Sequence, residues 1–127
     1  MNEYPRVLSA STLMSDKVVN PERETLGDVK EIMIDLNEGR IAYVVLSFGG
    51  FLGMGDKLFA VPWEALTLDT DEHVFILNVD KERLENAPGF DKDNWPDNAQ
   101  YEAGWLLDVY DYYGYIPYWS AERQHRL

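Results

Sequence analysis

The side chains that could do chemistry in this chain are its histidines, a group of aspartates and a glycine-rich segment. His73 and His125 are the only histidines, and the 127 residues include no cysteine. A zinc site needs three or four suitable ligands, and a catalytic triad needs a nucleophile beside its histidine. Neither histidine comes with a third ligand or an identifiable nucleophile. We therefore expect no catalytic residue, no metal and no cofactor here.

Three aspartates, Asp91, Asp93 and Asp97, are spaced so that they could collect a hard cation such as Ca²⁺. An EF-hand loop would have an Asp or Asn ligand where Trp95 stands, and the glycine and glutamate that should follow are missing. We therefore favour turn hydrogen bonds and helix capping as the roles of these aspartates.

The glycine-rich segment Gly49–Lys57 superficially resembles a phosphate-binding loop. A P-loop has the pattern G-x-x-x-x-G-K-[ST] and precedes a helix, so that backbone amides face the phosphates. Here Asp56 separates Gly55 from Lys57, and the apolar residues that follow predict a strand. We expect a structural loop. A small-ligand binder or enzyme that uses this segment is the alternative.

The balance of charges argues against a nucleic-acid partner. Lys and Arg number 11 against 23 Asp and Glu, a net charge of −12. Such a surface repels phosphate backbones and anionic lipids, and no run of Lys or Arg indicates a local basic patch. We therefore expect no direct binding of nucleic acid.

The chain also lacks the signature of a membrane or secreted protein. Its longest apolar run, Ile41–Leu46, is far below the about 20 residues that a membrane helix needs. The N-terminal residues Met1–Arg6 lack the apolar core of a secretory signal. We expect a soluble, cytoplasmic protein without a transmembrane segment.

The elements that position these residues begin with a hairpin. Residues 26–36 and 41–48 flank the turn Asn37–Arg40, in which Gly39 can take the positive φ that closes such loops. The first arm alternates imperfectly, with Ile32, Ile34 and Leu36 expected on one face and Glu31, Met33 and Asp35 on the other. The second arm is apolar on both faces, which is typical of a central strand with a cover on each side.

Further short strands are expected at residues 17–20, 58–61, 67–69 and 73–79. Ser9 or Ser11 should cap one helical turn, and Asp80 a short helix through Leu84. About six short strands with closely spaced turns are typical of a small antiparallel barrel. The predicted fold class is therefore mainly β, a small antiparallel β-barrel with a C-terminal helical extension.

The last third differs in character. A turn-rich connector over residues 87–96 leads to a capping box formed by Asp97 and Gln100. An apolar stripe then predicts a helix over residues 97–113, which Gly114 ends, followed by an aromatic tail. Aromatic side chains either cover the second face of the barrel or form an interface, and the two roles can coexist. With the loop residues Phe51 and Leu52, they form the candidate interaction surface: Trp95, Trp105, Tyr112, Tyr113, Tyr115, Tyr118 and Trp119.

The barrel segment resembles the PRC-barrel domain, named for the H subunit of the photosynthetic reaction centre. The resemblance rests on a G-x-V-x-x-I-x-I-D strand within Leu26–Asp35, a G-R-I-x-Y-V-V strand at Gly39–Val45, and a V-P-W-E-A-L turn at Val61–Leu66. The extension resembles that of stand-alone bacterial PRC-barrel proteins. The resemblance implies adaptor-like use and names no activity.

We thus expect a PRC-barrel-like domain over residues 4–84 and an extension over residues 85–127 that packs on the barrel or on a second subunit. The expected function is that of a non-catalytic protein-interaction module, self-associating as a dimer, with an unknown protein partner. A peripheral component of a membrane electron-transfer complex is a further alternative.

Overall fold

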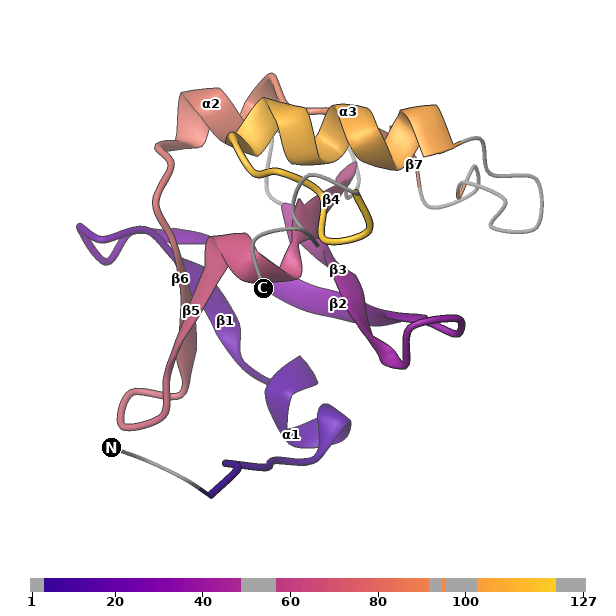
Figure 1. Ribbon diagram of the computed structural model, residues 1–127. Coiled ribbons are helices and arrows are strands. Elements are labelled where there is room, and N and C mark those ends of the chain that lie inside the picture. The colour runs from indigo at the N-terminus through magenta and orange to yellow at the C-terminus, as the bar shows by residue number, and fades with distance from the viewer. Residues whose placement is uncertain (1–3, 49–56, 92–94, 96–102, 121–127) are drawn as a thin grey trace.

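The computed structural model describes residues 4–48, 57–91, 95 and 103–120, and Figure 1 shows how they are arranged. The described elements are α1 (Ala10–Met14), β1 (Lys17–Val19), β2 (Thr25–Asp35), β3 (Arg40–Phe48), β4 (Lys57–Pro62), the 3-10 helix η1 (Trp63–Ala65), β5 (Leu66–Asp69), β6 (Val74–Leu77), α2 (Lys81–Glu85), β7 (Gly89–Asp91) and α3 (Ala103–Tyr113). The predicted mainly β fold with a C-terminal helix is confirmed.

The strands form one seven-stranded sheet in the order β5-β6-β1-β2-β3-β4-β7. Two expectations need correction. The sheet is not closed into a barrel, because its edge strands β5 and β7 are short, with four and three residues, and do not pair with each other. It is also not wholly antiparallel, since β1 runs parallel to β6. The seventh strand, β7, comes from the connector that the sequence pattern assigned to irregular structure.

The doubly apolar strand β3 is central, as its pattern predicts, with β2 on one side and β4 on the other. Its alternating side chains enter two separate hydrophobic clusters. Val44, Leu46 and Phe48 join the inner cluster, and Tyr43 and Val45 join an outer cluster. Both faces of β3 are therefore covered within the subunit.

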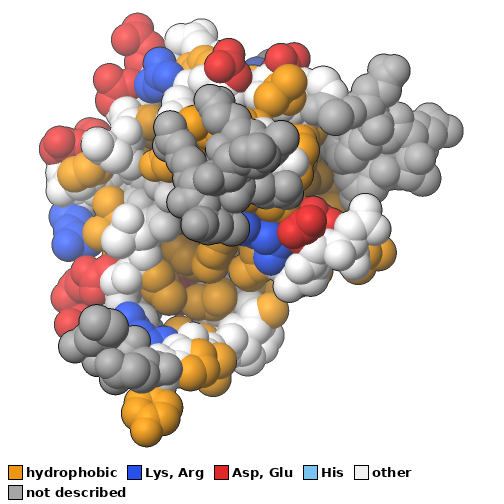
Figure 2. All heavy atoms as spheres, in the orientation of Figure 1, with side chains coloured by type: hydrophobic (Ala, Val, Ile, Leu, Met, Phe, Trp, Pro, Cys, Tyr) orange, Lys and Arg blue, Asp and Glu red, His pale blue; other side chains and the backbone are white. Residues whose placement is uncertain are grey.

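The inner face of the sheet is only partly enclosed. Figure 2 shows hydrophobic side chains gathered in a hollow between the β5–β6 end of the sheet and the β2–β3 hairpin. The apolar side chains that pack on the inner cluster while staying partly exposed include Met14, Ile32, Trp63, Leu66 and Leu68.

Helix α3 lies over the outer face of the sheet (Figure 1) and supplies the second cover of β3. Its Val109 and Tyr110 are fully buried in the outer cluster, and the Tyr110 hydroxyl donates to the Ala42 carbonyl at 2.7 Å. A second link joins α3 to α2, because Arg83 donates to the Tyr112 carbonyl and the Tyr112 hydroxyl donates to the Arg83 carbonyl. The helix is therefore packed on the sheet of its own chain.

Several local predictions are confirmed by backbone geometry. The Ser9 side chain caps α1 by accepting from Thr12, and Asp80 caps α2 by accepting from Arg83. Gly39 in the hairpin turn and Gly114 after α3 take φ values of 67° and 82°, which glycine adopts at little cost. The predicted capping box at Asp97 and Gln100 lies outside the described residues.

The candidate interaction groove

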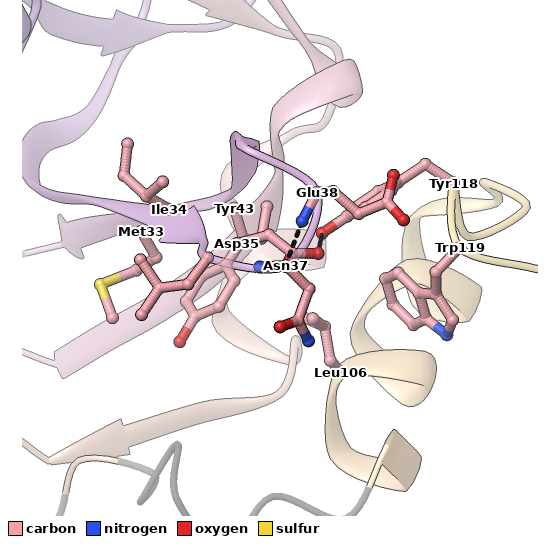
Figure 3. A pocket seen from close by; sticks show the side chains of 11 residues that line it. Met33, Ile34, Asp35, Asn37, Glu38, Tyr43, Leu106, Tyr118 and Trp119 are labelled. Atoms are coloured by element: carbon pink, nitrogen blue, oxygen red, sulfur yellow. Dashed lines mark hydrogen bonds between the residues drawn. The ribbon is translucent and has the colours of Figure 1, made fainter.

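A groove lies between the tip of the β2–β3 hairpin and the C-terminal helix with its tail. We call it the hairpin–tail groove. It has a volume of about 610 Å³ and is lined by Met33, Ile34, Asp35, Leu36, Asn37, Glu38, Ala42, Tyr43, Leu106, Tyr118 and Trp119. In Figure 3, Leu106 and Trp119 stand on the helix-and-tail side, while Met33 and Tyr43 stand on the hairpin side. The two walls come from segments about 70 residues apart in sequence.

The hairpin wall is shaped by an irregularity in β2. The pairing of β2 with β3 shifts register between Met33 and Ile34, which is the signature of a β-bulge. Ile32 packs on the inner cluster and Met33 on the outer one, but beyond the bulge the alternation no longer buries apolar residues. Ile34 is 56% exposed and Leu36 is 91% exposed. The three residues were expected on one face, but beyond the bulge Ile34 and Leu36 do not pack with Ile32 on the inner cluster.

Asp35 holds the two walls together. Its Oδ1 accepts from the backbone amides of Asn37 and Glu38, at 2.9 and 3.2 Å, which fixes the turn. Its Oδ2 accepts from the Tyr118 hydroxyl at 2.5 Å (Figure 3). This last bond is the main cause that lowers the pKa of the Asp35 carboxyl below its ordinary 3.8, against the opposing effect of burial. Asp35 is therefore an anion at neutral pH.

The tail wall is an aromatic stack around Tyr118. Tyr118 and Trp119 meet edge to face with ring centroids 5.0 Å apart, and both rings contact the buried Tyr110 of α3. The Arg40 guanidinium lies 3.9 Å from the centroid of the Tyr118 ring, at cation–π distance. Burial, followed by the hydrogen bond to Asp35, raises the pKa of Tyr118 above its ordinary 10.0. The tyrosine therefore stays a neutral hydrogen-bond donor.

The charge of the groove is negative. Among the described residues, its lining contains two carboxylates, Asp35 and Glu38, and no Lys or Arg. Arg40, the first residue of β3, is engaged with Tyr118. Glu38 is exposed at the turn and forms no ion pair with any described residue. The groove thus combines exposed apolar side chains with an unpaired carboxylate at its rim.

Most of the aromatic residues that the sequence singled out pack within the subunit. Trp95 and Trp105 stack on Phe90 in the outer cluster, with ring centroids 5.1 and 6.1 Å away. Tyr112 and Tyr113 pack against the inner cluster, and Tyr113 against the outer cluster too.

Tyr118 and Trp119 line the groove, whereas Tyr115 is 37% exposed beside the end of α3. Phe51 and Leu52 lie outside the described residues.

The other candidate sites can be placed only in part. Lys57 begins β4, but the rest of the Gly49–Lys57 segment lies outside the described residues, as do Asp93, Asp97 and His125. His73 is exposed in the β5–β6 turn with a φ of 58°. No group of three His, Asp or Glu side chains suited to a metal occurs in the part of the chain that the structure describes. None of its helices is long and apolar enough to cross a membrane.

Sequence reasoning missed every groove residue except Tyr118 and Trp119, and among those missed are the apolar Met33, Ile34, Leu36 and Leu106. The sequence carries one signal, since Ile34 and Leu36 flank Asp35 at the end of a hairpin arm, where apolar residues have little core to reach. The β-bulge that turns them outward cannot be recognised from the alternation of apolar and polar residues in the sequence. Leu106 is separated from them by about 70 residues, and only the packing of α3 joins the two walls.

Comparison with known proteins identifies the family. A search of curated proteins finds no match to this chain. A family model, by contrast, matches residues 5–84 as a PRC-barrel domain. This match covers α1 to α2, and with them the sheet up to β6, and it spans well over half of the chain. The chain, with its seven-stranded open sheet and its C-terminal helix, therefore belongs to the PRC-barrel domain family.

Proposed function

We propose that this protein is a non-catalytic protein-interaction module that binds a partner in the hairpin–tail groove. The observation that carries the proposal is the exposure of Ile34 and Leu36 at the edge of a lined groove. Burial of one such side chain contributes about 1.5–3 kcal/mol. Two of them beside a groove therefore offer enough free energy to anchor a partner, since a few central residues carry most of the free energy of an interface.

The state of Asp35 supports a binding role over a catalytic one. Both of its carboxylate oxygens already accept hydrogen bonds, and its pKa lies below the ordinary value. A general base works best with a pKa near the operating pH and with a free oxygen directed at the substrate. Asp35 instead connects the hairpin to the tail and fixes the shape of the groove.

We further propose that the protein acts in the cytoplasm and self-associates as a dimer. The sequence supports the location through its lack of cysteine, because small secreted domains are commonly stabilised by disulfide bonds. The hollow on the inner face of the sheet offers an apolar surface for self-association (Figure 2). Light scattering after size-exclusion chromatography measures the subunit number, and a monomer at all concentrations would contradict the dimer.

A photo-crosslinking amino acid at position 36 tests the proposed function. The matched control carries it at Thr70, which has the place of Leu36 in the β5–β6 turn, where Asp69 Oδ1 accepts from the amides of Asp71 and Glu72 as Asp35 does from Asn37 and Glu38 in the other turn. Position 36 should capture a protein in cells, and the purified partner should then lose affinity for the Leu36→Ser variant in calorimetry. Equal capture from both positions, or an unchanged affinity of Leu36→Ser, contradicts the proposal.

A further inference from the structure

We propose that the segment bound in the hairpin–tail groove is a peptide with apolar side chains next to Lys or Arg. This inference rests on the proposed function and specifies its partner. It follows from two properties of the groove, the apolar character of its walls and the sign of its charge. Each points to a different part of the same ligand.

The apolar walls require apolar side chains from the partner. Met33 and Tyr43 on the hairpin side face Leu106 and Trp119 on the other (Figure 3). Ile34 and Leu36 extend this surface outward, at 56% and 91% exposure. A wholly polar segment would leave these side chains in water and would gain nothing from their burial.

The rim requires a cation. Glu38 is exposed, forms no ion pair with a described residue and lies beside the carboxylate of Asp35. No Lys or Arg lines the groove in the part of the chain that the structure describes, and the chain carries a net charge of −12. Such a potential attracts a basic segment and raises its association rate, and it repels an acidic one. The Asn37 side chain, which points into the space between the walls in Figure 3, adds an amide oxygen that can accept from a Lys or Arg.

The same charges argue against a second copy of the chain in this groove. A second copy brings another net charge of −12, and a two-fold contact through the hairpin tips would place Glu38 of each copy near the same patch of the other. Like charges in contact lower affinity, and the described lining of the groove contains no basic residue that would compensate for them. Self-association is therefore assigned to other surfaces.

The chain contains its own matched control for this groove. The β5–β6 turn repeats the hydrogen bonds of the β2–β3 turn, with Asp69 in the place of Asp35 and Glu72 in the place of Glu38. Its last turn residue, His73, has the positive φ that Gly39 has in the other turn. Thr70 replaces Leu36, and this turn points away from α3 and the tail (Figure 1). Glu38→Lys and Glu72→Lys therefore change charge equally in like turns.

Three fluorescent peptides of equal length test the inference by anisotropy at physiological ionic strength. One consists of leucine and lysine, one of leucine and glutamate, and one of serine and lysine. The leucine–lysine peptide should bind at least about tenfold more tightly than the other two, which corresponds to 1.4 kcal/mol. Leu36→Ser and Glu38→Lys should each weaken it by about tenfold, and Glu72→Lys by less than about twofold.

Each other outcome overturns the inference in a recognisable way. If Glu72→Lys weakens binding as much as Glu38→Lys, the peptide responds to net charge alone. If the leucine–glutamate peptide binds best, the partner is not basic. Neither this outcome nor an equal effect of Glu72→Lys and Glu38→Lys contradicts the proposed function. If Leu36→Ser dissociates a dimer in light scattering, a second copy occupies the groove. If a chain shortened to end at Ser120 binds far more tightly, residues 121–127 occupy it. If the peptide binds and neither groove variant matters, the proposed function fails as well.

Discussion

Replacement of Tyr110 by alanine should remove a large part of the stability of the whole protein, and not only of its extension. The side chain is 0% exposed, its hydroxyl donates to Ala42 of β3, and its ring contacts Tyr118 and Trp119. Loss of a large buried aromatic side chain costs about 3–5 kcal/mol. A domain of this size has about 5–15 kcal/mol in total. Tyr110→Phe removes only the hydrogen bond and should cost about 1–2 kcal/mol.

Urea denaturation followed by circular dichroism and tryptophan fluorescence measures both variants. Tyr115→Ala is the matched control, because it makes the same chemical change at a side chain that is 37% exposed, and it should cost clearly less than Tyr110→Ala. Both probes should report one transition, shifted by Tyr110→Ala. The reasoning is refuted if Tyr110→Ala leaves the midpoint unchanged, or if the fluorescence alone shifts, since α3 would then unfold without the sheet.

Three further predictions follow from charge and burial. Val44→Asp and Val45→Asp should each lower the free energy of unfolding by about 3–5 kcal/mol, as measured by thermal melts. The Val44 side chain lies in the inner cluster and that of Val45 in the outer cluster, so either change buries an unpaired charge. An unchanged melting temperature for one of them would mean that its face of β3 is open. The lowered pKa of Asp35 stabilises the folded state above pH 3.8. The raised pKa of Tyr118 stabilises it below pH 10.0. The stability lost in Tyr118→Phe should therefore be largest between roughly pH 5 and 9 and shrink as the pH falls below 3.8, and a loss independent of pH would rule out the bond to Asp35 as its source. Labelled RNA should show no saturable binding at physiological salt, given the net charge of −12, whereas a micromolar affinity that falls steeply with salt would contradict this.

The fold could be predicted from the sequence wherever local signals agree. The alternation of apolar residues and the turn residues were sufficient to predict the β2–β3 hairpin. The doubly apolar pattern of β3 correctly predicted that both of its faces are covered. The open sheet and the strand β7 were missed. Strand pairing over long sequence distances is set by the tertiary fold, and β7 is only three residues long, with Gly89 and Asp91 at its ends, two residue types that strands disfavour.

The candidate site was less predictable than the fold. Tyr118 and Trp119 belonged to the predicted aromatic surface, and they do line the groove. The opposite wall was missed because a β-bulge in β2 changes which residues face outward without changing the residue pattern. The bond between Asp35 and Tyr118 joins residues 83 positions apart, and nothing local in either segment indicates it.

The most direct test of the hairpin–tail groove as the binding surface is a backbone amide chemical-shift titration of the isotope-labelled protein with the leucine–lysine peptide. The account predicts that the largest shifts occur at residues 33–38, at Leu106 and at Tyr118 and Trp119, and that they saturate together. The amides of the matched turn at residues 69–73 should hardly move. Shifts that are largest in that turn, or that spread evenly over the acidic surface, would contradict the account.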